Sequence, residues 1–340
     1  MSVAESADGP TRFNARMALA RRNALLLAAT QAIAGSASPI SISLGGLAGF
    51  YLLGADKSLA TAPVTGFNVG VAAGALPAAW LMRQVGRRYG FMTGAASLAL
   101  GGLIAAIALF RSDFILFIVG LVIIGMGAAF TQQYRFAAAD GAPTSFKASA
   151  ISWVLAGGVF AAIIGPQTVI YTRELFAPVS FAGSFLAILP LAALATLILA
   201  FLKIPQDTVV GDEDHDDRPA RPLLTVISQR RFITAMICGI GTYALMSFMM
   251  TGAPLAMVGC GFSPNLATLG IQWHVMAMFA PSFITGRLIR RFGRDVITGV
   301  GLLILLGCAI VAHMGIELWN FWLALILLGV GWNFGFIGAT

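Results

Sequence analysis

The amino-acid sequence predicts an all-α, polytopic membrane protein made of two pseudo-symmetric helical bundles, and three observations lead to this prediction. Only 10% of the 340 residues are charged and 58% are hydrophobic, whereas a soluble domain carries about a quarter charged residues. The charges are clustered, and each uncharged stretch between the clusters reaches the roughly 20 residues that a helix needs to cross a bilayer. The third observation is a loop sequence that occurs twice.

The uncharged stretches predict ten membrane spans. The stretch 232–286 is too long for one helix, and it contains the turn-rich sequence CGFSPN at 260–265, where we expect a break. The expected spans are 24–53, 64–84, 91–110, 114–134, 148–172, 180–202, 232–258, 267–287, 296–314 and 318–338. The three cysteines have no metal-ligand spacing, so we expect neither a metal nor a cofactor.

Lysine and arginine fall almost entirely on one side of these spans. If the N-terminus is cytoplasmic, only Lys57, Arg111 and Arg173 of the 21 basic residues lie on the other side. The positive-inside rule therefore places the tail 1–22 and the central linker 203–231 in the cytoplasm, with the spans in the plasma (inner) membrane. The net charge of +7 reflects this topology, and we expect no nucleic-acid partner.

The linker contains GDEDHDDRPARP and separates six predicted helices (23–202) from four (232–340). Two short sequences that occur before the linker recur after it. RQVGRRYG around Gly86 corresponds to RRFGRD around Gly293, 207 positions later, and IGMGAAF at 124–130 corresponds to LGVGWNF at 328–334, 204 positions later. Nearly equal offsets indicate a duplicated six-helix unit, as in many transporters. Symmetry predicts two further helices in the second bundle, so we expect a truncated 12-span chain; a natural ten-span form is the alternative.

The repeated loop resembles the signature of the major facilitator superfamily, Gly-x-x-x-Asp-Arg-x-Gly-Arg-Arg. The residues that match it in the two copies are Gly86, Arg87, Arg88, Gly286, Arg291, Gly293 and Arg294. Those that depart from it are Ala79, Arg83 and Gln84 in the first copy and Arg290 in the second. In the fifth span, Gly165-Pro166 is similar to the helix bend of many antiporters of this superfamily. The resemblance implies a monomeric secondary transporter that works by alternating access and is coupled to the proton gradient.

The loop residues Gly86, Arg87 and Arg88, and in the second copy Gly293 and Arg294, are candidate gating residues. The glycine turn joins two helices, and the arginines after it can pair with helix-end carbonyls and acids on the cytoplasmic face. The Asp that usually completes the motif is missing from both copies. The alternative is that these arginines only anchor the topology.

Polar side chains inside the spans are candidates for solute binding, because they are costly in lipid and tend to face the bundle interior. These candidates are Gln31, Asn68, Tyr243, Trp273, His274 and Asn333. The resemblance, in which the first, fourth, seventh and tenth helices line the cavity, favours Gln31, Tyr243 and Asn333. An interhelical hydrogen bond is the alternative role for each. His274 is also a candidate proton site, because it is the mid-span group that titrates near neutral pH.

These observations predict secondary active transport of a small organic solute rather than catalysis. The spans have no mid-membrane Asp or Glu that would serve an enzyme or a cation carrier, and the ATP-binding pattern GxxxxGK[ST] is absent. Aromatic residues such as Trp273 and Trp332 suit a flat, uncharged solute, so import of a vitamin such as riboflavin is one alternative. Broad efflux of hydrophobic drugs would use the same lining. The expected partners are the solute, the lipid bilayer and a coupling proton.

Overall fold

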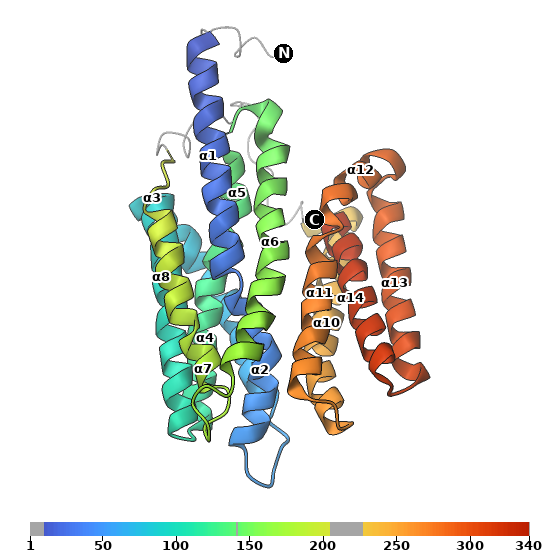
Figure 1. The fold of residues 1–340 in the computed structure, drawn as a ribbon. Helices are drawn as coiled ribbons and strands as arrows, with labels where there is room; N and C mark the ends of the chain where they lie inside the picture. Colours follow the sequence, from blue (N-terminus) through green and yellow to red (C-terminus); the bar gives the residue numbers. More distant parts are fainter. Residues whose placement is uncertain (1–9, 141, 205–226, 340) are drawn as a thin grey trace. The chain divides into compact units, whose positions relative to one another are not determined.

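The computed structural model describes residues 10–140, 142–204 and 227–339, and all regular secondary structure in these ranges is helical (Figure 1). The first half contains α1 (Pro10–Ala34), α2 (Ala37–Leu52), α3 (Ala62–Phe110), α4 (Phe114–Thr131), α5 (Tyr134–Asp140), α6 (Thr144–Thr172), α7 (Ala182–Leu186) and α8 (Ile188–Leu199). The second half contains α10 (Arg230–Gly259), α11 (Pro264–Phe279), α12 (Ser282–Phe292), α13 (Arg294–Met314) and α14 (Leu318–Ala339).

The predicted spans correspond to these helices, several of which are interrupted. The first span comprises α1 and α2, which meet at Gly35-Ser36, and the eighth comprises α11 and α12, which meet at Ala280-Pro281. In the described residues, eight helical stretches are long and apolar enough to cross a membrane, and one of them, Ala62–Phe110, contains the second and third spans. The prediction of an all-α, polytopic membrane fold is confirmed.

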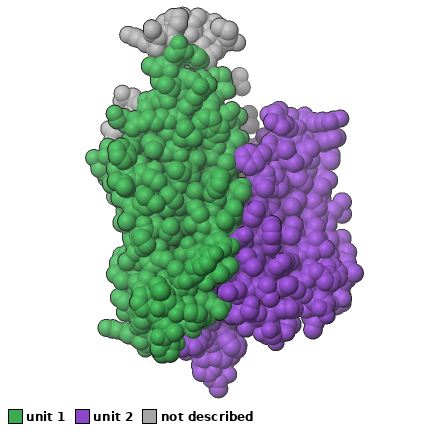
Figure 2. Space-filling model, in the orientation of Figure 1, with its two compact units in different colours: residues 1–41, 62–211 green, residues 42–61, 212–340 purple. Residues whose placement is uncertain are grey.

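The chain divides into two compact units, Met1–Ser41 with Ala62–Gly211 and Ile42–Thr61 with Asp212–Thr340 (Figure 2). The segment after Ser41 belongs with the second unit, where a Cβ at Gly46 would lie 3.3 Å from Leu255 Cδ1. The domain boundaries at the linker 203–231 and the tail 1–22 stay predictions, because residues 205–226 and 1–9 lie outside the described part of the chain.

The two copies of the loop have the same backbone geometry. Gly86 interrupts α3 with φ 80° and ψ 162°, and Gly293 separates α12 from α13 with φ 87° and ψ 158°. Both glycines lie in a region of backbone space that L-residues with a side chain rarely occupy. In addition, α4 begins at Phe114 and α14 at Leu318, the same 204-residue offset that the sequence repeat shows. Local structure therefore follows the duplication.

Small residues bring the helices of the first unit close together. A Cβ at Gly101 on α3 would lie 2.6 Å from the backbone nitrogen of Ile124 on α4, and one at Gly120 on α4 would lie 2.7 Å from the nitrogen of Ala105. Such contacts are typical of membrane helix pairs, where close packing replaces the hydrophobic effect between helices.

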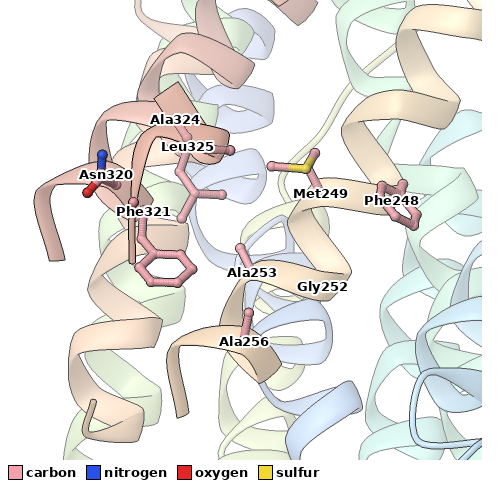
Figure 3. Close-up of a pocket in the computed structure, with 11 residues that line it drawn as sticks. Phe248, Met249, Gly252, Ala253, Ala256, Asn320, Phe321, Ala324 and Leu325 are labelled. Atoms are coloured by element: carbon pink, nitrogen blue, oxygen red, sulfur yellow. The ribbon is translucent and has the colours of Figure 1, made fainter. Parts of the chain in front are cut away.

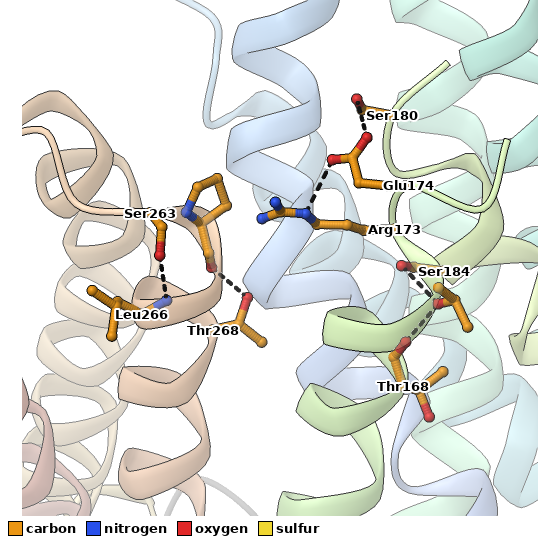
Figure 4. A network of polar contacts seen from close by, with 10 residues as sticks. Thr168, Arg173, Glu174, Ser180, Ser184, Ser263, Leu266 and Thr268 are labelled. Atoms are coloured by element: carbon orange, nitrogen blue, oxygen red, sulfur yellow. Dashed lines mark hydrogen bonds and ion pairs between the residues drawn. The ribbon is translucent and has the colours of Figure 1, made fainter. Parts of the chain in front are cut away.

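A polar network orders the connection between α6 and α7 in the same unit (Figure 4). Arg173 Nε lies 3.1 Å from Glu174 Oε1, and the Ser180 hydroxyl donates to Glu174 Oε2 at 3.0 Å. The Thr172 hydroxyl donates to Ser184 Oγ at 3.1 Å. The Thr172–Ser184 bond ties the end of α6 to the start of α7, and the two contacts of Glu174 order the loop between them.

In the second unit, α14 packs against α10, α11 and α13. A Cβ at Gly335 would lie 3.1 Å from Thr242 Oγ1 on α10, one at Gly331 would lie 2.9 Å from Leu305 Cδ2 on α13, and one at Gly270 on α11 would lie 2.9 Å from Leu325 Cδ1. The glycines of α14 therefore define where the neighbouring helices can approach it, and α14 is the helix around which the candidate site is built.

Candidate solute-binding site

Three aromatic rings of the second unit form a cluster between α10 and α14. Trp332 and Phe336, four residues apart on one face of α14, are stacked with a centroid distance of 4.9 Å and an interplanar angle of 11°. Tyr243 of α10 lies 6.5 Å from Trp332 at 60° and 6.0 Å from Phe336 at 53°. We call Tyr243, Trp332 and Phe336 the aromatic cluster; the close approach of α10 to Gly335 allows it to form.

The Trp332 indole is the unusual member of this cluster. Its Nε1 atom is buried and has no hydrogen-bond acceptor among the described residues. On the same helix, by contrast, the Trp322 indole donates to the Leu266 carbonyl at 3.2 Å. Buried donors are nearly always paired, so an unpaired one needs an explanation. The aromatic cluster therefore combines three apolar rings with one buried donor that has no protein acceptor.

Asn333, a predicted solute ligand, is instead occupied by protein contacts. It is fully buried, and its Nδ2 donates to the Met278 carbonyl at 2.6 Å and to Ser282 Oγ at 2.7 Å. Its Oδ1 accepts from the Thr285 hydroxyl at 2.6 Å. These partners lie on either side of the break between α11 and α12. The geometry favours a structural role in which Asn333 holds that break against α14, and its role in binding solute stays a prediction.

His274 is also fully buried and is positioned by α14. Its Nδ1 lies 2.9 Å from the Leu325 carbonyl oxygen. A carbonyl can only accept, so Nδ1 carries the proton, and Nε2 is left as a buried acceptor with no donor among the described residues. Nε2 therefore keeps a free lone pair, and the role of His274 as a proton site stays a prediction. The preceding residue, Trp273, is 40% exposed and is not part of the aromatic cluster.

The remaining predicted solute residues lie in the first unit, on α1 and α3. Gln31 and Asn68 are both partly buried, and the Gln31 amide lies over the break after α1, where a Cβ at Gly35 would be 2.6 Å from its Nε2. Helix α6 continues through Gly165 and Pro166 as one element, so the bend stays a prediction. A Cβ at Gly165 would lie 2.7 Å from Pro39 Cγ, which gives this glycine a packing role.

An apolar pocket of about 240 Å³ lies in the second unit, among α10, the end of α13 and the start of α14 (Figure 3). Its lining includes Phe248, Met249 and Phe321, and the Asn320 amide is already used, by the Val311 carbonyl at 3.3 Å and the Glu317 N–H at 3.2 Å. Solute sites usually exceed about 300 Å³ and offer several polar groups. This pocket therefore does not suit a polar solute.

The sequence repeat explains the position of this pocket. At the 204-residue offset Phe321 corresponds to Phe117, which is fully buried in the first unit and packs edge-on against Phe185 of α7, with a centroid distance of 5.2 Å. The pocket thus lies where α7 lies in the first unit, and we interpret it as a place for helix packing.

The candidate gating loop at Gly86 has an acidic partner that the sequence did not reveal. Arg87 forms an ion pair with Asp140 at the end of α5, within the first unit. The motif's own Asp is replaced by Arg83, but Asp140 supplies a carboxylate from elsewhere in the chain. Arg88 Nε is buried without a hydrogen-bond partner among the described residues, although the guanidinium lies 5.6 Å from the centre of the Tyr89 ring. In the second copy of the loop, Arg294 forms no ion pair with the described residues.

Two of these features were missed from the sequence. The i, i+4 spacing of Trp332 and Phe336 on the tenth span was the available signal for the aromatic cluster. Asp140, an isolated acid just beyond the fourth span, was the signal for the partner of Arg87.

Comparison with known proteins decides the family. A sequence profile described as Major Facilitator Superfamily matches residues 22–340. The chain belongs to the major facilitator superfamily. Its membership agrees with the repeated loop and the glycine geometry, and it makes this chain an integral membrane transporter of a small solute rather than an enzyme.

Two relatives and one solved structure illustrate the place of the chain in the superfamily. It is 50% identical over 321 residues to the riboflavin transporter RfnT of Brucella anthropi, a match that covers 94% of this chain and 80% of RfnT. It is 30% identical over 336 residues to the MFS-type transporter YdeG of Bacillus subtilis, covering 95% of this chain and 77% of YdeG. The structure of the xylose transporter XylE from E. coli, at 13% identity, shares the fold with a TM-score of 0.62, covering 96% of this chain and 83% of XylE.

Proposed function

We propose that this chain imports riboflavin, or a flat heteroaromatic vitamin closely related to it, by alternating access. The observation that carries the proposal is the 50% identity, over 94% of the chain, to a riboflavin transporter. Broad efflux of hydrophobic drugs is the competing function within the same superfamily.

The chemistry of the second unit supports a neutral, flat solute. The aromatic cluster provides ring surface on which the tricyclic ring system of a flavin can pack, and aromatic pairs gain free energy beyond area burial alone. Every acidic residue in the described part of the chain lies in a loop or at a helix end, so no mid-span carboxylate is available there to pair with a cationic solute.

We further propose that the transport cycle is coupled to the proton gradient across the plasma (inner) membrane, with the N-terminus and the linker in the cytoplasm. His274 Nε2 supplies a buried proton acceptor in the second unit, and the arginine-rich loops at Gly86 and Gly293 supply the gating contacts. Both halves of the repeat lie in one chain, which supports a monomer as the transport unit.

The test is uptake into cells that cannot make or import riboflavin, with and without the protein. Riboflavin, nucleobases, sugars, amino acids and cationic dyes are each measured with and without an uncoupler. Riboflavin uptake that depends on the protein and is abolished by the uncoupler would support proton-driven import. Lowered accumulation of several unrelated dyes, without riboflavin uptake, would show multidrug efflux and overturn the proposal.

A further inference from the structure

The unpaired indole N–H of Trp332 lies in a fixed position. Its ring is stacked on Phe336 at 4.9 Å, and Tyr243 lies against it from α10 at 6.5 Å. Both contacts restrict rotation of the side chain, so the direction of the N–H bond is set before any solute arrives. A preorganised donor of this kind is what gives a binding site its specificity.

We propose that Trp332 is a specificity-determining residue whose N–H donates to a ring nitrogen or ring carbonyl of the transported solute. This inference rests on the proposed function and deepens it: the site selects heteroaromatic rings that carry an in-plane acceptor, and it discriminates against aromatic hydrocarbons of the same shape.

The orientations of the Trp332 and Tyr243 rings determine how the solute would lie in this site. An indole N–H lies in the plane of its ring, so one solute ring cannot stack on Trp332 and accept its hydrogen bond at the same time. The acceptor approaches the edge of Trp332. Tyr243 is inclined by 60° to Trp332 and by 53° to Phe336, so its ring presents a separate surface on which the solute can lie. Trp332 therefore supplies the hydrogen bond and Tyr243 the stacking surface.

The contrast with Trp322 shows that an unpaired donor is not a general property of this helix. Both tryptophans are on α14, but only Trp322 has a protein acceptor, the Leu266 carbonyl. A buried donor without a partner raises the free energy of the protein, because its lost hydrogen bond to water is not replaced. An acceptor on the solute replaces that hydrogen bond and removes the cost. A site with such a donor rejects analogues that lack the acceptor, because binding them leaves the donor unpaired.

The experiment measures selectivity in Trp332→Phe, which keeps an aromatic ring and removes the N–H. Riboflavin KM is measured by uptake, together with inhibition constants for lumichrome, which has ring acceptors, and 9-anthracenemethanol, a three-ring system whose ring has none. We expect the riboflavin KM and the lumichrome constant to rise about 5–30-fold, the effect of losing one hydrogen bond, with the anthracene constant unchanged. Trp322→Phe and Trp80→Phe, the latter at a side chain 63% exposed on α3, are the matched controls and leave the selectivity ratio unchanged.

A second replacement covers the case in which Trp332→Phe does not fold. Benzothienylalanine at position 332 has a sulfur atom in place of the N–H and almost the same shape, and the same loss of selectivity is expected. Equal changes in the constants of all three compounds, or no change in any of them, would overturn the inference. Riboflavin uptake by the wild type would still leave the proposed function intact in that case. Absence of riboflavin uptake by the wild type would overturn both.

Discussion

The ion pair between Arg87 and Asp140 gives a quantitative test of the gating role proposed for the loop at Gly86. The Arg87 side chain is 18% exposed and that of Asp140 is 35% exposed. Exposed pairs contribute about 0.2–1 kcal/mol to stability. Breaking a buried pair by removing one partner costs about 3–5 kcal/mol. Partial exposure places this pair between the two limits, and we expect a coupling energy of about 1–2 kcal/mol.

The perturbation is a double-mutant cycle of Arg87→Gln, Asp140→Asn and the two together. If the pair holds the loop in its working arrangement, each single change lowers the maximal rate of riboflavin uptake about 5–30-fold, the factor that corresponds to 1–2 kcal/mol. The double variant loses no more than the worse single variant, because the interaction is already lost after either change.

The assay is the initial rate of riboflavin uptake at equal membrane expression, with thermal unfolding of the purified variants as a second reading. Arg111→Gln is the control, because Arg111 is exposed and has no ion pair in the described residues; its rate should stay within about twofold of the wild type. Additive losses in the double variant, or single variants no worse than Arg111→Gln, would refute the reasoning and leave the arginines as topology anchors.

Two other predictions concern the second unit. Gly293 has φ 87° and ψ 158°, a conformation that is almost confined to glycine, and a Cβ added there would have no neighbouring atom within 4 Å. Gly293→Ala therefore has only a backbone cost, about 1–3 kcal/mol. Its thermal unfolding temperature should fall below that of Gly299→Ala, a helical position with equally open space, and equal temperatures would contradict the positive φ of Gly293. Asn333→Ala removes three hydrogen bonds to α11 and α12, so we expect it to lower the free energy of unfolding by about 2–4 kcal/mol without changing the riboflavin KM of the folded fraction. A raised KM at unchanged stability would instead show that Asn333 contacts the solute.

The sequence was sufficient for features that arise from neighbouring residues. Uncharged stretches predicted the spans because any helix in lipid must form its backbone hydrogen bonds internally and expose apolar side chains. The glycines at 86 and 293 predicted matching turns, since a positive φ is a local property of the backbone. The superfamily followed from the same loop and from the repeat.

The use of individual polar atoms could not be predicted in this way. Asn333 and His274 satisfied the same criterion, a polar side chain inside an apolar span. Only the packed helices show that both polar side-chain atoms of Asn333 have hydrogen-bond partners. His274, by contrast, has one ring nitrogen, Nε2, without a hydrogen-bond partner among the described residues. The carboxylate that pairs with Arg87 was sought within the motif, but it comes from a residue 53 positions away.

The sequence by itself therefore determined the all-α membrane fold, the positions of the spans and the duplication, because hydrophobicity, charge and glycine geometry act over one helix or one turn. The tertiary structure alone decided which side chains form the aromatic cluster, which donor in it is left unpaired and which acid meets Arg87. The contacts of Tyr243 with α14 and of Asp140 with Arg87 join residues on different helices, tens of positions apart, and they depend on how closely the helices approach each other.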